Sequence, residues 1–115
     1  MNISPLPSDR NRRASPRKMI RGEAIIVHGG TSKLAQTWDL GRDGMCLVSP
    51  RPIAPGTRCT ITFDVPFRSE RINVIATAKV VYSSYSAAGE FKIGAVFVDL
   101  ADEVAQVLTR FAAGS

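Results

Sequence analysis

Two long segments in which apolar and polar side chains alternate constrain the fold more than any other feature of this sequence. In residues 57–65 three apolar side chains share one face: Cys59, Ile61 and Phe63. Residues 71–82 repeat the pattern with five: Ile72, Val74, Ala76, Ala78 and Val80. A period of two predicts β-strands that each bury one face. The second segment is long for a strand, so we expect a bend or bulge within it.

Shorter segments of the same kind surround these two and are separated by turn residues. Further strands are expected at residues 18–27, 32–38, 45–48 and 91–98, with turns at residues 41–44 and 83–89. A helix opens at residues 101–102, and its apolar face is Val104, Val107, Leu108 and Phe111. This order predicts a mainly β fold, a small antiparallel β-barrel of about six strands with one C-terminal α-helix.

The charge of the chain is concentrated near its start. A chain of 115 residues suits one domain, and its net charge of +5 favours an anionic partner. Six basic residues lie within twelve positions: Arg10, Arg12, Arg13, Arg17, Lys18 and Arg21. Prolines and serines accompany them. We therefore predict a flexible, basic N-terminal tail at residues 1–11 and a single domain over residues 12–115.

Several classes of function find no support in the sequence. Cys46 and Cys59 lie in apolar strands without metal-ligand spacing, which predicts buried free thiols in a reducing compartment and no metal site. The alternative is a disulfide between neighbouring strands, which would need an oxidising compartment. His28 follows a predicted strand beside Gly29-Gly30 and has no nucleophile or second histidine near it, so we interpret it as a surface turn residue. No catalytic pair of carboxylates stands out, and the chain is not expected to be an enzyme. The absence of a long apolar run or signal peptide predicts a cytoplasmic protein without membrane insertion.

Two short motifs carry the chemistry that points to a ligand. Residues 13–17 read R-A-S-P-R, and residues 39–44 read D-L-G-R-D-G. Arginine pairs bind phosphates through bidentate, charge-assisted hydrogen bonds. Asp39 could accept hydrogen bonds from the N–H edge of a guanine, and glycines allow close approach of a flat ligand. The pair of motifs predicts a binder of a guanine nucleotide with more than one phosphate.

These motifs resemble those of the PilZ domain, a receptor for the bacterial second messenger cyclic di-GMP. The family pattern is RxxxR followed by [D/N]xSxxG, and the resemblance extends over residues 12–111. Residues 91–99 are similar to the last barrel strand of PilZ domains. Gly41 stands where the family has serine, so one ligand-binding hydroxyl is absent. A second RxxxR register, from Arg17 to Arg21, overlaps the first. We prefer the first because in the family the second arginine precedes the first strand.

The resemblance implies a set of ligand-binding residues: Arg12, Arg13, Arg17, Asp39, Gly41, Arg42, Gly44 and Gly94. An arginine at position 12 implies a stacked pair of ligand molecules in one site. Gly44 is expected to have a positive φ or to lie close to the ligand, and Gly94 to lie under the ligand or ease a strand bend. Alternation places Trp38 on the face opposite Asp39, so we interpret it as a core or barrel-wall residue.

The leading hypothesis is a receptor that orders its arginine-rich segment over the barrel when cyclic di-GMP binds. It would relay the signal to an unidentified downstream protein, as a monomer or a ligand-dependent dimer, without any cofactor. Two alternatives remain. One is a PilZ-like adaptor that no longer binds nucleotide, which Gly41 motivates. The other is a basic nucleic-acid-binding β-barrel, which is disfavoured because the sequence has few aromatic residues for base stacking.

Overall fold

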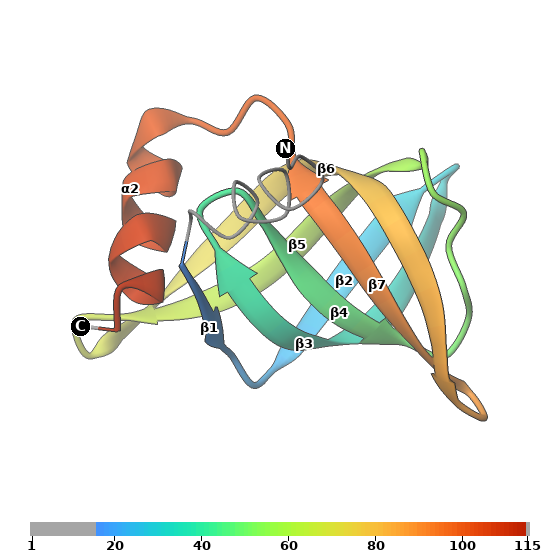
Figure 1. Ribbon diagram of the computed structural model, residues 1–115. Coiled ribbons are helices and arrows are strands. Elements are labelled where there is room, and N and C mark those ends of the chain that lie inside the picture. The colour runs from blue at the N-terminus through green and yellow to red at the C-terminus, as the bar shows by residue number, and fades with distance from the viewer. Residues whose placement is uncertain (1–15, 115) are drawn as a thin grey trace, which may run out of the picture.

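The described part of the chain folds into seven strands followed by one helix (Figure 1). The computed structural model describes residues 16–114. The elements are β1 (Arg17–Met19), β2 (Glu23–His28), β3 (Thr31–Gly41), β4 (Gly44–Ser49), β5 (Arg58–Phe67), β6 (Glu70–Ala87), β7 (Glu90–Phe97) and α2 (Asp102–Ala112). The predicted mainly β class with a C-terminal helix is confirmed. The predicted tail at residues 1–11 lies outside the described residues.

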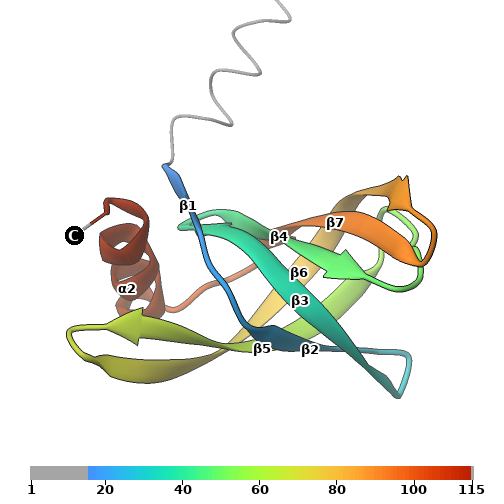
Figure 2. The same ribbon diagram turned by 90° about the horizontal axis from the view of Figure 1, so that it is seen from below.

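All seven strands pair antiparallel in one sheet of order β1-β3-β2-β5-β6-β7-β4. An additional pairing between β3 and β4 closes six of them into a ring, as Figure 2 shows from below. The first part of β3 pairs with β2 and its last part pairs with β1 along the same edge. The expected number of about six strands therefore describes the ring, and β1 is a seventh strand beside it.

The core fills this ring from the inward faces of the strands. The alternation read from the sequence is confirmed, because the inward residues of two strands are buried: Cys59, Ile61 and Phe63 in β5, and Val74, Ala76, Ala78 and Val80 in β6. Helix α2 lies across one end of the ring (Figure 1) and buries Leu108 and Phe111 against the same core. Cys46 and Cys59 are buried free thiols, as predicted. Among the described residues no helix is long and apolar enough to span a bilayer.

The segment expected as one strand over residues 18–27 is two strands with a break between them. β1 pairs with the end of β3, whereas β2 pairs with its beginning, so the chain must step along β3 between the two. Thr37 stabilises this step, because its Oγ1 lies 3.0 Å from the carbonyl oxygen of Ile20 and 3.2 Å from that of Gly22, and the two oxygens share its hydroxyl hydrogen. The second arginine of the RxxxR motif was expected before the first strand. Arg17 instead is the first residue of β1.

The turn expected at residues 83–89 is also wrong, because β6 continues to Ala87. The β6–β7 hairpin extends beyond the core, and most of residues 81–90 are exposed. Since neither face is buried there, the sequence lacks the alternation that would identify a strand. The irregularity expected in β6 is confirmed by two register shifts, one between Val80 and Tyr82 and one between Tyr85 and Ala87.

Candidate ligand-binding face

The two sequence motifs meet on the outer face of the ring. In the first motif, Arg17 Nη1 donates a hydrogen bond to Asp39 Oδ1 of the second motif at 2.9 Å, an ion pair between two partly exposed side chains. The same carboxylate oxygen accepts from the backbone N–H of Cys46 at 3.2 Å. β1 places the guanidinium beside the carboxylate because Met19 pairs with Asp39 and Arg17 with Gly41. A cation and an anion that could both bind a nucleotide are therefore adjacent.

From Asp39 a row of residues crosses four strands. Asp39 pairs with Cys46 of β4, Cys46 pairs with Gly94 of β7, and Gly94 pairs with Tyr82 of β6. We call Asp39, Cys46, Gly94 and Tyr82 the cross-strand row. Two members of the predicted site, Asp39 and Gly94, belong to it. Tyr82 was missed, because only the β6–β7 register places it there.

A β-bulge lies at each end of the cross-strand row. In β3 the register shifts between Thr37 and Asp39, so Trp38 is an extra residue, and in β6 Val81 is extra in the same way. Each bulge interrupts the alternation, so two successive side chains point outward. Trp38 is 39% exposed and shares the outer face with Asp39. The interpretation of Trp38 as a core or wall residue facing away from Asp39 is wrong for this reason.

Lysine and aromatic side chains complete the face around the row. The ammonium of Lys92, on β7, lies 4.1 Å from the centroid of the Trp38 ring. Lys92 is two residues before Gly94 and so shares its face of the strand. No motif in the sequence identified Lys92. After Arg17, Lys92 is a second cation on this face, and the two lie on opposite sides of Asp39.

Tyr82 is packed over Gly94, and a side chain at that position would collide with its ring. The Tyr82 hydroxyl donates to Cys46 Sγ at 3.6 Å. Burial raises the pKa of Tyr82 to about 12, and the hydrogen bond to Cys46 adds to the shift. Burial likewise raises the pKa of the Cys46 thiol. Both groups are therefore neutral near pH 7, and the Cys46 thiol is not an activated nucleophile. Tyr82 as a whole remains 46% exposed.

Gly41 and Gly44 each allow two backbone segments to approach closely. A Cβ at Gly41 would lie 2.5 Å from the carbonyl oxygen of Pro16, and a Cβ at Gly44 would collide with the carbonyl oxygen of Ala95 in β7. Neither glycine has a positive φ. The expected positive φ at Gly44 is therefore wrong, and its close approach is to β7. The glycine at position 41 lets β1 lie directly on β3.

The remaining predicted residues are placed as follows. Arg42 is exposed in the β3–β4 turn, with its Nη1 3.9 Å from Asp43 Oδ1. Arg12 and Arg13 lie outside the described residues. Of the predicted arginines at the N-terminus, the structure therefore places only Arg17 beside the second motif. Within residues 16–114, no group of histidine, cysteine, aspartate or glutamate side chains could hold a metal ion.

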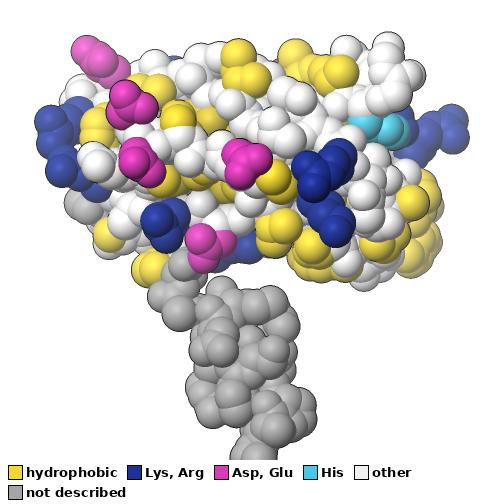
Figure 3. Space-filling model, turned by 90° about the horizontal axis from the view of Figure 1, so that it is seen from above, with side chains coloured by type: hydrophobic (Ala, Val, Ile, Leu, Met, Phe, Trp, Pro, Cys, Tyr) yellow, Lys and Arg dark blue, Asp and Glu magenta, His cyan; other side chains and the backbone are white. Residues whose placement is uncertain are grey.

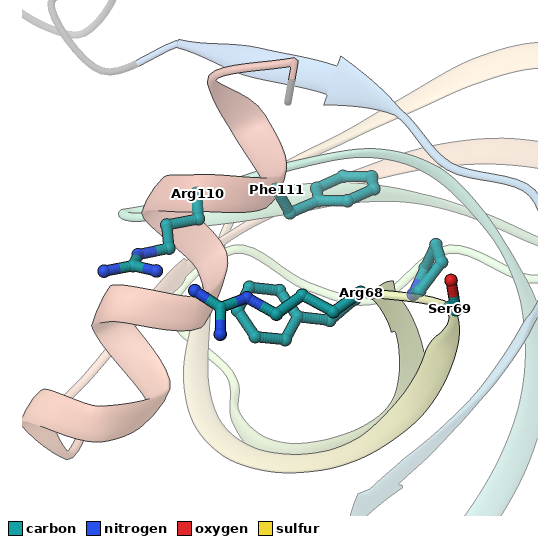
Figure 4. Close-up of a pocket in the computed structure, with 6 residues that line it drawn as sticks. Arg68, Ser69, Arg110 and Phe111 are labelled. Atoms are coloured by element: carbon teal, nitrogen blue, oxygen red, sulfur yellow. The ribbon is translucent and has the colours of Figure 1, made fainter.

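A separate pocket of about 590 Å³ lies between α2 and the tip of the β5–β6 hairpin. Figure 4 shows the guanidinium groups of Arg68 and Arg110 on the same side of this region, with the Phe111 ring directed away from them. Its lining is Pro66, Phe67, Arg68, Ser69, Arg110 and Phe111, which includes no residue of the predicted site. The motifs therefore point to the open outer face and not to this pocket.

This chain is similar in sequence to a known domain family and in fold to several solved structures. The sequence model of the PilZ domain matches residues 11–114. The fold is similar to that of the Bacillus subtilis inhibitor of motility MotI/DgrA, with a TM-score of 0.77 and 13% identity over 89% of this chain and 50% of that chain. It is also similar to Borreliella burgdorferi PlzA in complex with c-di-GMP, with a TM-score of 0.64 and 16% identity over 93% of this chain and 43% of that chain.

Escherichia coli YcgR in complex with c-di-GMP is a third similar structure, with a TM-score of 0.56 and 13% identity over 86% of this chain and 43% of that chain. The chain thus spans half or less of the length of each of these proteins. A comparison with curated protein sequences finds no match. Because the family model covers almost the whole sequence, and the fold agrees with it, this chain belongs to the PilZ domain family.

Proposed function

We propose that this chain is a receptor for cyclic di-GMP that binds the nucleotide on the cross-strand row, together with the N-terminal arginines. The observation that carries the proposal is the Arg17–Asp39 ion pair at 2.9 Å, which lies at one end of the row on the outer face. Two proteins of similar fold, PlzA and YcgR, have structures in complex with c-di-GMP, which supports the same ligand class.

The chemistry of the face suits a ligand with two phosphates and two guanines. Arg17 can donate two parallel hydrogen bonds to a phosphate or to the O6 and N7 acceptors of a guanine. Asp39 can accept from the N1 and N2 edge of a guanine. The exposed ring of Tyr82 offers a flat apolar surface for a base, and Gly94 leaves room for that ring. Lys92 contributes a further positive charge.

Binding requires a rearrangement, because Arg17 and Asp39 occupy each other in the free protein. The ligand exchanges this ion pair for its own contacts and draws Arg12 and Arg13 over the face, and the ordered segment signals to a downstream protein. The missing hydroxyl at Gly41 removes one hydrogen bond, about 0.5–1.5 kcal/mol, so we expect an affinity lower by about tenfold or less. The role is that of a non-catalytic cytoplasmic receptor, and the reduced Cys46 and Cys59 suit that compartment.

Isothermal titration with cyclic di-GMP, with GTP as the control ligand, tests the proposal. We expect Arg17→Ala and Asp39→Asn each to weaken binding by about tenfold or more, because each removes a charge-assisted contact. Asp99→Asn is the matched control for Asp39, since it removes an exposed carboxylate away from the row at a positive φ that asparagine tolerates. A stoichiometry of two ligands per chain would support stacking on Arg12. Unchanged affinity in both site variants would overturn the proposal.

A specific observation keeps the adaptor alternative open. With Gly41 in place of serine, β1 is docked on β3 and Arg17 is neutralised by Asp39, so the face could persist in this form without ligand. Absence of heat at saturating cyclic di-GMP would favour the adaptor.

Within residues 16–114, no comparable observation favours a nucleic-acid interface. Figure 3 shows acidic and basic side chains interspersed on one face instead of a continuous basic surface. A nucleic-acid binder would also show a steep fall of affinity with salt.

A further inference from the structure

Four large apolar side chains lie exposed together on the outer face of β3, β2, β5 and β6. They are Leu34, Ile25, Ile75 and Val27, with exposed fractions from 37% to 66%, and we call them the apolar strip. They belong to two adjacent rows of paired residues: Leu34, Ile25, Thr62 and Ile75 in one, and Ser32, Val27, Thr60 and Thr77 in the other. Figure 2 shows the strands concerned side by side.

The apolar strip has no part in the candidate ligand-binding face. The cross-strand row runs through the end of β3, β4, β7 and the later part of β6, whereas the strip uses the other strand pairings of the ring. Single exposed apolar side chains are ordinary, but a contiguous group of them on a soluble domain indicates a contact surface. Its threonines and β-branched residues form an even surface that can pack against another sheet.

Charges of opposite sign border the strip at its two ends. Glu23 of β2 and Asp64 of β5 lie at one end of the strip, one residue beyond the Ala24–Phe63 pair. At the other end Arg58 pairs with Lys79. All four side chains are exposed. Within residues 16–114 the structure gives Glu23, Arg58 and Lys79 no ion pair. The apolar strip is therefore bordered by two carboxylates at one end, with Arg71 one row beyond them, and by two cations at the other end.

We propose that the apolar strip is the interface of a symmetric dimer of this chain. The two-fold axis lies in the interface, perpendicular to the strands and midway between the two apolar rows. Rotation about it places each strand on the same strand of the second copy, with the strand direction reversed. Ile25 then packs on Val27 of the second copy, and Asp64 meets Arg58 of the second copy. The acidic end of each copy thus faces the basic end of the other, as a two-fold interface between identical surfaces requires. This charge complementarity identifies a second copy as the occupant.

Sedimentation velocity of the full chain without nucleotide, over micromolar to millimolar concentration, tests the dimer independently of ligand binding. We expect a concentration-dependent dimer that Ile25→Lys converts to monomer. Val81→Lys is the matched control, because Val81 is 47% exposed, against 46% for Ile25, but lies away from the strip. We expect it to dimerise like the parent. A parent that remains monomeric throughout, or equal association of the two variants, would overturn the proposal.

A charge exchange gives a second test that does not depend on the apolar contact. Arg58→Asp and Asp64→Arg should each weaken self-association by about tenfold, because each places like charges together at two symmetry-related contacts. The double variant restores both pairs with the signs exchanged and should return to the parental dissociation constant. Arg71→Glu, on the same face one row beyond Asn73, controls for net charge and should have less effect than Arg58→Asp. Failure of the double variant to recover would refute this pairing of the two copies.

Discussion

Substitution of Gly41 tests how the N-terminal strand is held on the ring. A Cβ at this position would lie 2.5 Å from the Pro16 carbonyl oxygen and 3.3 and 3.4 Å from Cγ and Cδ of Arg17. The first separation is far below a van der Waals contact and involves backbone, so the side chain cannot relieve it by rotating. Gly41→Ala and Gly41→Ser should therefore both push β1 away from β3.

The cost follows from what β1 contributes when it is docked. The exposed Arg17–Asp39 ion pair is worth about 0.2–1 kcal/mol. The backbone hydrogen bond from Ile20 N to Trp38 O, at 3.1 Å, adds about 0.5–1.5 kcal/mol. The Lys18 ammonium, 5.1 Å from the Phe111 ring centroid, adds about 0.5–1 kcal/mol. Partial loss of these contacts predicts a fall of about 1–3 kcal/mol in the free energy of unfolding.

Urea denaturation measures this fall, and hydrogen exchange of the amides of residues 18–20 locates it. Gly22→Ala is the matched control, since a Cβ there would meet only Thr37 Oγ1 at 3.8 Å, and Gly22 has no positive φ. We expect the control to be neutral or slightly stabilising. If Gly41→Ala is as stable as the parent and β1 exchanges no faster, the contact between Gly41 and Pro16 does not limit the docking of β1.

Three further predictions follow from the same structure. Gly44→Ala should lower the free energy of unfolding by about 1–3 kcal/mol, because its Cβ would overlap the backbone of β7, and an unchanged melting temperature would contradict this. Tyr82→Ala should weaken cyclic di-GMP binding by about tenfold or more in a titration, whereas Tyr82→Phe keeps the stacking ring and most of the affinity; equal losses would instead assign the effect to the hydroxyl. Since burial raises the pKa values of both cysteines and of Tyr82, the folded state holds these protons more tightly than the unfolded chain. Stability should therefore be full below about pH 9 and fall as pH rises toward 12, less steeply in Tyr82→Phe, and a flat profile above pH 9 would contradict it.

The parts of the fold that depend on burial were predictable from the sequence. The alternation in β5 and in the core part of β6 is the direct result of one face being buried, and the apolar face of α2 has the same origin. The adjacency of Arg17 and Asp39 was reached through the family motifs and not through any local pattern. The structure brings them together by pairing β1 with the end of β3.

What the sequence did not predict depends on strand register. A bulge opposite β4 puts Asp39 on the same outer face as Trp38, and a bulge opposite β7 turns Tyr82 outward. A bulge is set by the partner strand, which a single sequence does not identify. The roles of Gly41 and Gly44 are hidden for the same reason, because each glycine accommodates a backbone segment that is distant in sequence or belongs to another strand.

An NMR titration of the isotope-labelled chain with cyclic di-GMP tests the central claim most directly, because it reports binding and location together. We expect the largest amide shifts at Arg17, at residues 39–46, at Gly94 and at Tyr82, and little change at Ile25 and Ile75 on the apolar strip. Shifts confined to the pocket at Arg68 and Arg110, or none at saturating ligand, would contradict the assignment of the cross-strand row as the nucleotide-binding face.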